Sequence, residues 1–152
     1  MFDLDDCVAY VTCKSAKALA HRLEKRLESY DVTRVQWTAM YYVSKDELIT
    51  QKKLSEKMSL RESTIVRLID RMEKDGLLER VNSQQDKRVH NLVLTSKGDA
   101  LNQKLTAVAN QFKNDAIANI SQEDLSTFKA VLEQMLADTE INERLLSNEY
   151  FT

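Results

Sequence analysis

Hydroxyl and guanidinium groups gather on one side of a short segment near the middle of the chain. Ser63, Thr64 and Arg67 belong to the stretch SLRESTIVRLIDRMEKDG at 59–76. An arginine can bond guanine at two acceptors, and serine or threonine can bond bases or phosphates. The pattern therefore predicts contacts with nucleic acid, near the start of a helix, where base edges are usually met. The simpler interpretation is a solvated amphipathic helix with incidental cations.

A second group of charged residues follows in the loop NSQQDKR, between two runs typical of strands at 77–81 and 89–94. Lys87 and Arg88 can meet phosphates, and an arginine can enter a narrow minor groove. Asp86 can orient Arg88 through a charge-assisted hydrogen bond. An ordinary charged turn is the alternative. Since a lone two-stranded hairpin is barely stable in water, we expect this one to pack its apolar face on helices.

The elements that must position these groups are mostly helices. The spacing i, i+3, i+4 and i+7 of a buried helical face is occupied by Ile65, Leu68, Ile69 and Met72. Ser59 and Glu62 fit a capping box at the start of this helix, and Gly76 suits the left-handed residue after its end. Thr50 can cap a short helix ending near Met58. The connection of about three residues that remains has the length found in a helix-turn-helix.

Helices are also expected on both sides of this centre. Residues from about 4 to 30 carry apolar stripes, Thr33 can cap the helix VQWTAMYYV, Thr95 can cap a long helix, and Ser121 marks a last start. With no proline and only two glycines, the chain favours long helices. The order of elements predicts a mainly α fold, in which a winged helix-turn-helix lobe with a small β-hairpin wing is flanked by N- and C-terminal helices.

The charge distribution supports a nucleic-acid partner, although the whole chain has a net charge of −2. Residues 51–98 hold 11 Lys and Arg against 7 Asp and Glu, a net of +4. A local basic patch matters more for phosphate binding than the total. The sequence has no Gly-rich phosphate loop, nucleophile motif or His–carboxylate pair at catalytic spacing, so an enzyme is not expected. Without a run of about 18 apolar residues or a signal peptide, we expect a cytoplasmic protein with no membrane partner.

Two cysteines, Cys7 and Cys13, lie six residues apart. On one helix their side chains would point about 120° apart, which disfavours a disulfide within one chain. Together with His21 they form no recognised metal-ligand spacing, so neither a metal nor a cofactor is expected. Free cysteines usually behave as small buried apolar residues, and a redox-sensing thiol is the alternative.

The segment LSEKMSLRESTIVRLIDRMEKDGLLERVNSQQDKRVHNLVLTSKG resembles the core of the MarR (multiple antibiotic resistance regulator) family of winged helix-turn-helix transcription factors. The matching motifs are L-x-E-K-[ML], R-x-S-T-[VI], D-R-[ML]-E-K-x-G-L-[LI]-x-R, D-x-R and L-T-x-x-G, and YDVTRVQWTAM resembles the family's L-T-x-x-Q-W stretch. The similarity covers about residues 4–145. It implies one domain over 1–152, with a DNA-binding lobe at about 32–98 and dimerisation helices at about 4–30 and 96–146.

The resemblance also implies roles for particular residues. The recognition-helix positions of the family correspond to Arg61, Ser63, Thr64 and Arg67, and its wing motif corresponds to Asp86 and Arg88, with Arg88 in the minor groove. Val66 departs from the family's frequent polar residue and can touch a thymine methyl. The family is dimeric and binds pseudo-palindromic double-stranded DNA, usually as a repressor. We therefore expect a homodimeric, sequence-specific regulator; a helical interaction module that does not bind DNA is the rival.

Many members of the family bind a small aromatic or phenolic anion between the dimer region and the DNA-binding lobe. The residues that could line such a site here are His21, Arg34, Trp37 and Tyr41, with core aromatics beside a surface arginine as the alternative. In peroxide-sensing members the reactive cysteine lies near the start of the first helix. Alignment through VTRVQW puts that place near Ala9, between Cys7 and Cys13. A thiol-based redox sensor of the same fold is therefore a further alternative.

Overall fold

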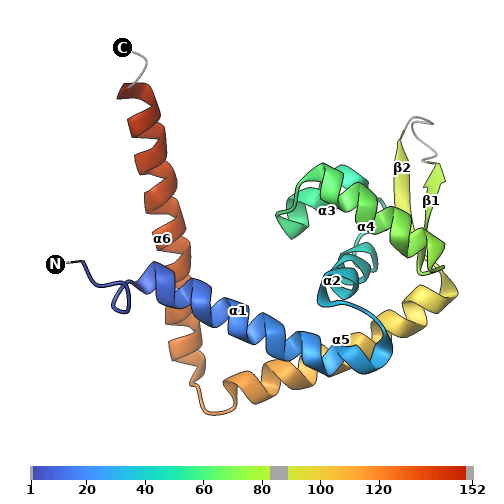
Figure 1. Cartoon of the computed structure of the whole chain (residues 1–152), viewed down its shortest axis with the longest axis horizontal. Helices are drawn as coiled ribbons and strands as arrows, with labels where there is room; N and C mark the ends of the chain where they lie inside the picture. Colours follow the sequence, from blue (N-terminus) through green and yellow to red (C-terminus); the bar gives the residue numbers. More distant parts are fainter. Residues whose placement is uncertain (1, 83–88, 150–152) are drawn as a thin grey trace. The chain divides into compact units, whose positions relative to one another are not determined.

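Helices make up most of the chain, and one antiparallel hairpin interrupts them (Figure 1). The computed structural model describes residues 2–82 and 89–149, and from residue 140 it describes the backbone alone. The elements in chain order are α1 (Val8–Leu27), a 3-10 turn η1 (Glu28–Tyr30), α2 (Arg34–Val43), α3 (Gln51–Met58), α4 (Glu62–Lys74), β1 (Leu78–Asn82), β2 (His90–Leu94), α5 (Ser96–Ile117) and α6 (Gln122–Glu149). This order confirms the mainly α, winged helix-turn-helix fold that the sequence predicts.

Threonine caps set the starts of three helices, as predicted. Thr33 forms a full capping box with Gln36 at the start of α2. Thr50 accepts a hydrogen bond from the backbone N–H of Lys53 at α3, and Thr95 accepts one from the N–H of Gly98 at α5. Each cap satisfies a donor that the first helical turn leaves without a partner. The first helix differs from prediction, because it begins at Val8 rather than near residue 4.

The predicted capping box of Ser59 and Glu62 is wrong. Ser59 has φ 51° and ψ 43°, a left-handed conformation that ends α3 instead of starting α4. The N–H of Leu60 reaches back to the carbonyl of Ser55, and the N–H of Ser59 reaches that of Glu56. Arg61 precedes α4 without a side-chain cap. The three-residue connection is nevertheless as predicted, since α3 ends at Met58 and α4 begins at Glu62.

The hairpin is stable because it is not alone. Its register pairs Leu78 with Leu94 and Arg80 with Leu92, and both Leu78 and Leu92 are buried. The backbone before α3 adds to the pairing, since the N–H of Leu92 donates to the carbonyl of Ile49 (2.9 Å) and Thr50 forms a bridge to Asn91. The strands thus share one core with the helix-turn-helix. This packing stabilises the hairpin, which alone would be only marginally stable in water.

One apolar core joins the helices and the hairpin. Its buried side chains include Met40, Ile49, Leu54, Ile65, Ile69, Met72, Leu78, Leu92 and Leu105. The chain divides into two compact units, Met1–Lys113 and Asn114–Thr152, and this core lies in the first. No described helix is long and apolar enough to cross a membrane.

Candidate nucleic-acid interface and adjoining pockets

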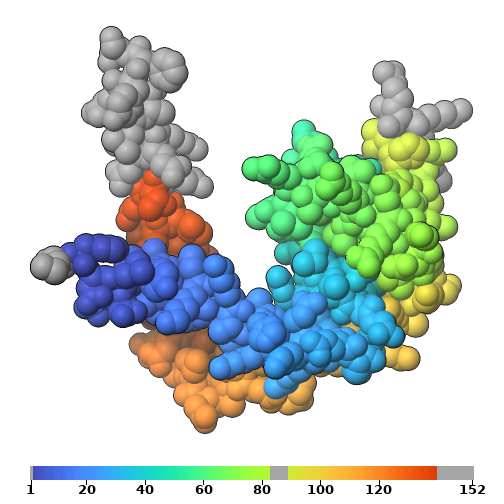
Figure 2. Space-filling view, viewed as in Figure 1, coloured from blue at the N-terminus to red at the C-terminus, as the bar shows by residue number. Residues whose placement is uncertain are grey.

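The outer face of α4 carries the residues that the sequence singles out. The side chains of Arg61, Ser63, Thr64 and Arg67 are all exposed. On the opposite face, Ile65, Ile69 and Met72 are buried and anchor the helix in the core. Figure 2 shows α3 and α4, in green, as part of the outer surface of the first unit. The structure therefore brings the four polar residues together on one accessible surface, which we call the α4 face.

Val66 lies on the same face and is 41% exposed. Two-fifths of its surface is therefore open to solvent. An exposed methyl pair next to Arg67 and Ser63 can make an apolar contact with a thymine methyl group in a major groove.

The C-terminal end of α4 is closed by a Schellman motif. Gly76 has φ +68°, and its N–H donates to the carbonyl of Glu73, while the N–H of Leu77 donates to that of Met72. A residue with a Cβ pays for the left-handed conformation, so glycine suits this position. Gly76 therefore turns the chain from α4 into β1, as the sequence predicts.

The start of α5 is bound to the same turn. The Lys97 ammonium donates to the carbonyl of Asp75, and the Thr95 hydroxyl donates to that of Gly76, both at 2.7 Å. The N–H of Thr95 donates to the carbonyl of Leu77. The carbonyls of three successive residues after α4 are thus bound by Thr95 and Lys97 at the start of α5.

Arg80 ties the first strand to α4. Its guanidinium pairs with Asp70 (2.6 Å) and with Glu73, and its backbone N–H donates to the Glu73 carboxylate (3.0 Å). The side chain of Arg80 is mostly covered, whereas that of Asp70 is largely exposed. These contacts fix the hairpin against the helix that carries the α4 face. This role of Arg80 is not among the sequence predictions. The signal in the sequence is the D-x-x-E spacing on one helical face, followed by an arginine on a strand.

The predicted wing residues Asp86, Lys87 and Arg88 lie outside the described residues. Their roles stay predictions. The strands on either side, β1 and β2, leave the core as a regular antiparallel pair up to Asn82 and His90.

Trp37 and Tyr41, two of the four predicted effector residues, lie side by side with ring centroids 6.1 Å apart. They line an open hollow of about 320 Å³, here called the Trp37 hollow, with Leu23, Thr106, Ala109 and Phe112 among its other walls. His21 is exposed on α1 and Arg34 is half-buried, and neither belongs to this lining. The backbone N–H of Arg34 is instead bound by the Glu24 carboxylate. The structure thus brings together the aromatic pair and leaves out the two basic residues.

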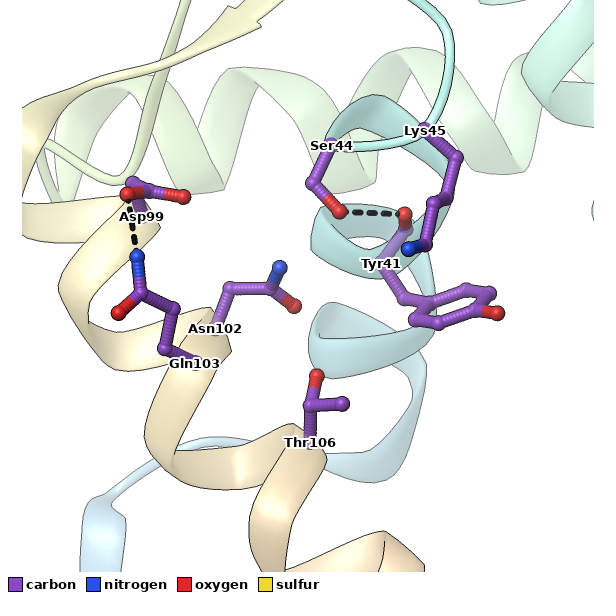
Figure 3. Close-up of a pocket in the computed structure, with 7 residues that line it drawn as sticks. All are labelled: Tyr41, Ser44, Lys45, Asp99, Asn102, Gln103 and Thr106. Carbon is purple, nitrogen blue, oxygen red and sulfur yellow. Dashed lines mark hydrogen bonds between the residues drawn. The ribbon is translucent and has the colours of Figure 1, made fainter.

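A second hollow of about 320 Å³ adjoins the first, since Tyr41 and Thr106 line both. This Asn102 pocket is formed by Tyr41, Ser44, Lys45, Asp99, Asn102, Gln103 and Thr106 (Figure 3). Neither Asn102 nor Lys45 is among the residues predicted from the sequence. The available signal is that Asn102 stands between Gly98 and Leu105 on the buried face of α5, where a polar residue is unusual.

The two cysteines differ in exposure. Cys13 is exposed and Cys7 is half-buried, so the expectation of small buried residues is not met for Cys13. In the described part of the chain, no group of three His, Cys, Asp or Glu side chains is placed to hold a metal ion.

Comparison with known proteins agrees with this geometry. The MarR family profile matches residues 32–90, which run from the start of α2 into β2. The organic hydroperoxide resistance transcriptional regulator of Bacillus subtilis (strain 168) is 26% identical over 133 residues, 88% of this chain and 89% of that protein.

Two solved structures show the same fold at low sequence identity. S. aureus MepR, in complex with DNA, is similar with a TM-score of 0.82 over 89% of this chain and 98% of that chain, at 21% identity. CouR from Rhodococcus jostii RHA1, bound to p-coumaroyl-CoA, has a TM-score of 0.80 over 89% of this chain and 95% of that chain, at 18% identity.

Proposed function

The chain belongs to the MarR family of transcriptional regulators, and we propose that it is a homodimeric repressor released from a pseudo-palindromic operator by a small aromatic molecule. The observation that carries the proposal is the α4 face. Arg61, Ser63, Thr64 and Arg67 are exposed on a helix whose other side is buried and whose C-terminal end is closed by the Schellman motif. A rigid helix with exposed guanidinium and hydroxyl groups suits readout of base edges and phosphates in a major groove. We add Lys87 and Arg88 as phosphate contacts and Asp86 as the residue that orients Arg88, from the chemistry of these side chains. The resemblance adds Arg88 as the cation in the minor groove.

We infer the second subunit of the homodimer from the exposed apolar side chains of α1 and α6. No described side chain of α6, which has 28 residues, is buried, and Phe128 and Leu136 are 56% and 67% exposed. Val8 and Val11 of α1 are also exposed. Helices of this kind gain most of their stability by burying an apolar face. A second copy of the chain would cover these faces, with the dimerisation helices at about 4–30 and 96–146 and the DNA-binding lobe at about 32–98.

A dimer would place two α4 helices in successive major grooves, about one helical turn of DNA apart. The effector would bind in the Trp37 hollow, between α2 and α5. Because the start of α5 holds the end of α4 through Thr95 and Lys97, a shift of α5 would change the spacing of the two α4 helices. A spacing that no longer matches the operator would lower the affinity. Equal spacing with and without the effector would contradict this mechanism.

The test uses the DNA directly upstream of the protein's own gene, the simplest candidate for an operator. Fluorescence anisotropy with unrelated DNA as competitor is expected to show tight, competitor-resistant binding. Binding no stronger than to unrelated DNA would contradict binding at this site. If, in addition, no other genomic fragment bound more tightly than unrelated DNA, the results would favour the alternative of a helical interaction module that does not bind DNA.

A second candidate trigger is oxidation of a thiol. The exposed Cys13, the partly exposed Cys7 and a relative named for organic hydroperoxide resistance favour it. Treatment with an organic hydroperoxide would then release the DNA from the wild type but not from Cys7→Ser or Cys13→Ser, whichever thiol reacts. Equal release from both variants and the wild type would exclude a role for either cysteine acting alone.

A further inference from the structure

Val66 is an apolar side chain on a side of α4 that is otherwise polar. Its exposed fraction is 41%, and no other large hydrophobic residue of α4, a helix that the structure describes in full, is exposed to this degree. The residues three before it and four after it, Ser63 and Asp70, lie next to it on the helix surface and are both exposed. On α4, Val66 therefore has no exposed apolar neighbour to pack against.

Folding alone does not favour valine at this position. A β-branched residue has a lower helix propensity than alanine, leucine or arginine, because its side chain loses rotamers against the preceding turn. A partly exposed methyl pair also gains only part of the free energy of burial. The same stiffness is an advantage in binding, since a side chain with one preferred rotamer loses little entropy when a partner covers it.

The direction of Val66 is fixed by its neighbours. Ile65 and Ile69 are fully buried, so α4 cannot rotate about its axis without exposing them. One turn after Val66, the Asp70 carboxylate binds the Arg80 guanidinium at 2.6 Å, and Figure 1 shows α4 beside the strand that carries Arg80. This ion pair also offsets a negative charge that would otherwise repel DNA phosphates close to Val66.

We propose that Val66 is a specificity-determining residue that contacts the C5-methyl group of a thymine, so that each operator half-site carries a thymine at this place. The inference rests on the proposed function, because it requires α4 to lie in a major groove. Among the bases of unmodified DNA, thymine alone displays a methyl group in that groove. Valine has no hydrogen-bonding side-chain group, so it would recognise the base by burying this methyl group. Ser63 and Arg67 would read the hydrogen-bonding groups of neighbouring base pairs.

The test begins with duplexes that the full chain selects from DNA with a randomised centre. Each thymine of the tightest-binding duplex is then replaced in turn by uracil, which removes the C5-methyl group and keeps the base-pairing groups and the O4 acceptor. Fluorescence anisotropy measures the Kd of each duplex. At one thymine position we expect the Kd to rise roughly fourfold for each half-site changed, the equivalent of one buried methyl group.

Val66→Ala shows whether the protein contacts this methyl group. Alanine favours an exposed helical position, so the variant is expected to fold, and thermal unfolding checks this point. It should bind the thymine and uracil duplexes with nearly equal affinity. Thr64→Ser is the matched control, because it removes the methyl group of the other α4 side chain that could contact a thymine and keeps the hydroxyl group. Its preference for thymine should persist.

Two results would overturn the inference and leave the proposed DNA binding in place, because tight binding of the selected duplex is measured first. One is that no replacement of thymine by uracil weakens binding. The other is a preference for thymine that survives in Val66→Ala, which would mean that the methyl group acts through the shape of the DNA or through Thr64. If the randomised DNA yields no enriched sequence, the proposed function fails, and the inference fails with it.

Discussion

A methyl group on Gly98 would lie 1.8 Å from the carbonyl oxygen of Leu77. The first turn of α5 therefore approaches the backbone that enters β1 more closely than any side chain allows. The same carbonyl accepts the N–H of Thr95. A glycine is thus required at position 98 for the contact between the start of α5 and the segment that follows α4. Substitution of Gly98 tests this contact separately from DNA binding.

Gly98→Ala is expected to lower the free energy of unfolding by at least about 2 kcal/mol, because α5 must move away from Leu77. Gly76→Ala serves as the comparison. Its Cβ would meet nothing within 4 Å, so only the left-handed conformation at φ +68° costs free energy, about 1 kcal/mol. Urea denaturation measures both. A smaller loss of unfolding free energy for Gly98→Ala than for Gly76→Ala would show that a methyl group fits between position 98 and the Leu77 carbonyl.

Arg80→Met is expected to loosen the hairpin from α4 and to lower stability by roughly 1 kcal/mol, since the ion pairs are partly exposed. Glu73→Gln should cost more than Asp70→Asn, because Asp70 is the more exposed partner and Glu73 also binds the Arg80 backbone. Thermal unfolding of the three variants tests this order. If Asp70→Asn lowered the stability more than the other two variants, Glu73 would not be the main partner that holds Arg80 on α4.

Ser59→Gly is expected to raise stability by about 0.5–1 kcal/mol, because glycine adopts φ 51° without steric cost. The matched variant Ser44→Gly, at a right-handed position with φ −70°, should give no gain. Chemical denaturation of the two variants distinguishes them. A gain at both positions, or at neither, would argue against a strained turn between α3 and α4.

Leu136→Asp is expected to raise the dissociation constant of the proposed dimer more than about tenfold, because a charge would enter an apolar interface. Thr127→Asp introduces the same charge on the other side of α6 and should leave the dimer intact. Sedimentation equilibrium measures both. A wild-type chain that is monomeric at micromolar concentration would contradict the dimer directly.

The sequence predicts the helices well where one residue type controls the start. Thr33, Thr50 and Thr95 cap helices as expected, and Gly76 ends α4 as expected. Ser59 was assigned wrongly because serine suits both a cap and a turn, and only the tertiary fold selects between them. The α4 face follows from helical periodicity alone, since its polar residues must oppose the buried stripe.

The pockets were harder to predict because they depend on how α2 faces α5. Periodicity places Trp37 and Tyr41 one turn apart on a helix, which is why that pair was found. It does not say that Arg34 would be held by Glu24 or that His21 would stay exposed. Asn102 was missed because a single asparagine in an apolar stripe gives no sign of whether it has a partner. That information exists only once the neighbouring helix is in place.

The most direct test of DNA binding by the α4 face is the salt dependence of DNA affinity. It is measured for the wild type and for Arg67→Ala. Lys104→Ala, which removes an exposed cation on α5, is the control. We predict that Arg67→Ala weakens binding. If Arg67 contacts a phosphate, the slope of log K against log salt also falls by about one; if it reads a base, the loss differs between sequences. Lys104→Ala should change neither quantity. Unchanged affinity and slope in Arg67→Ala would contradict the account.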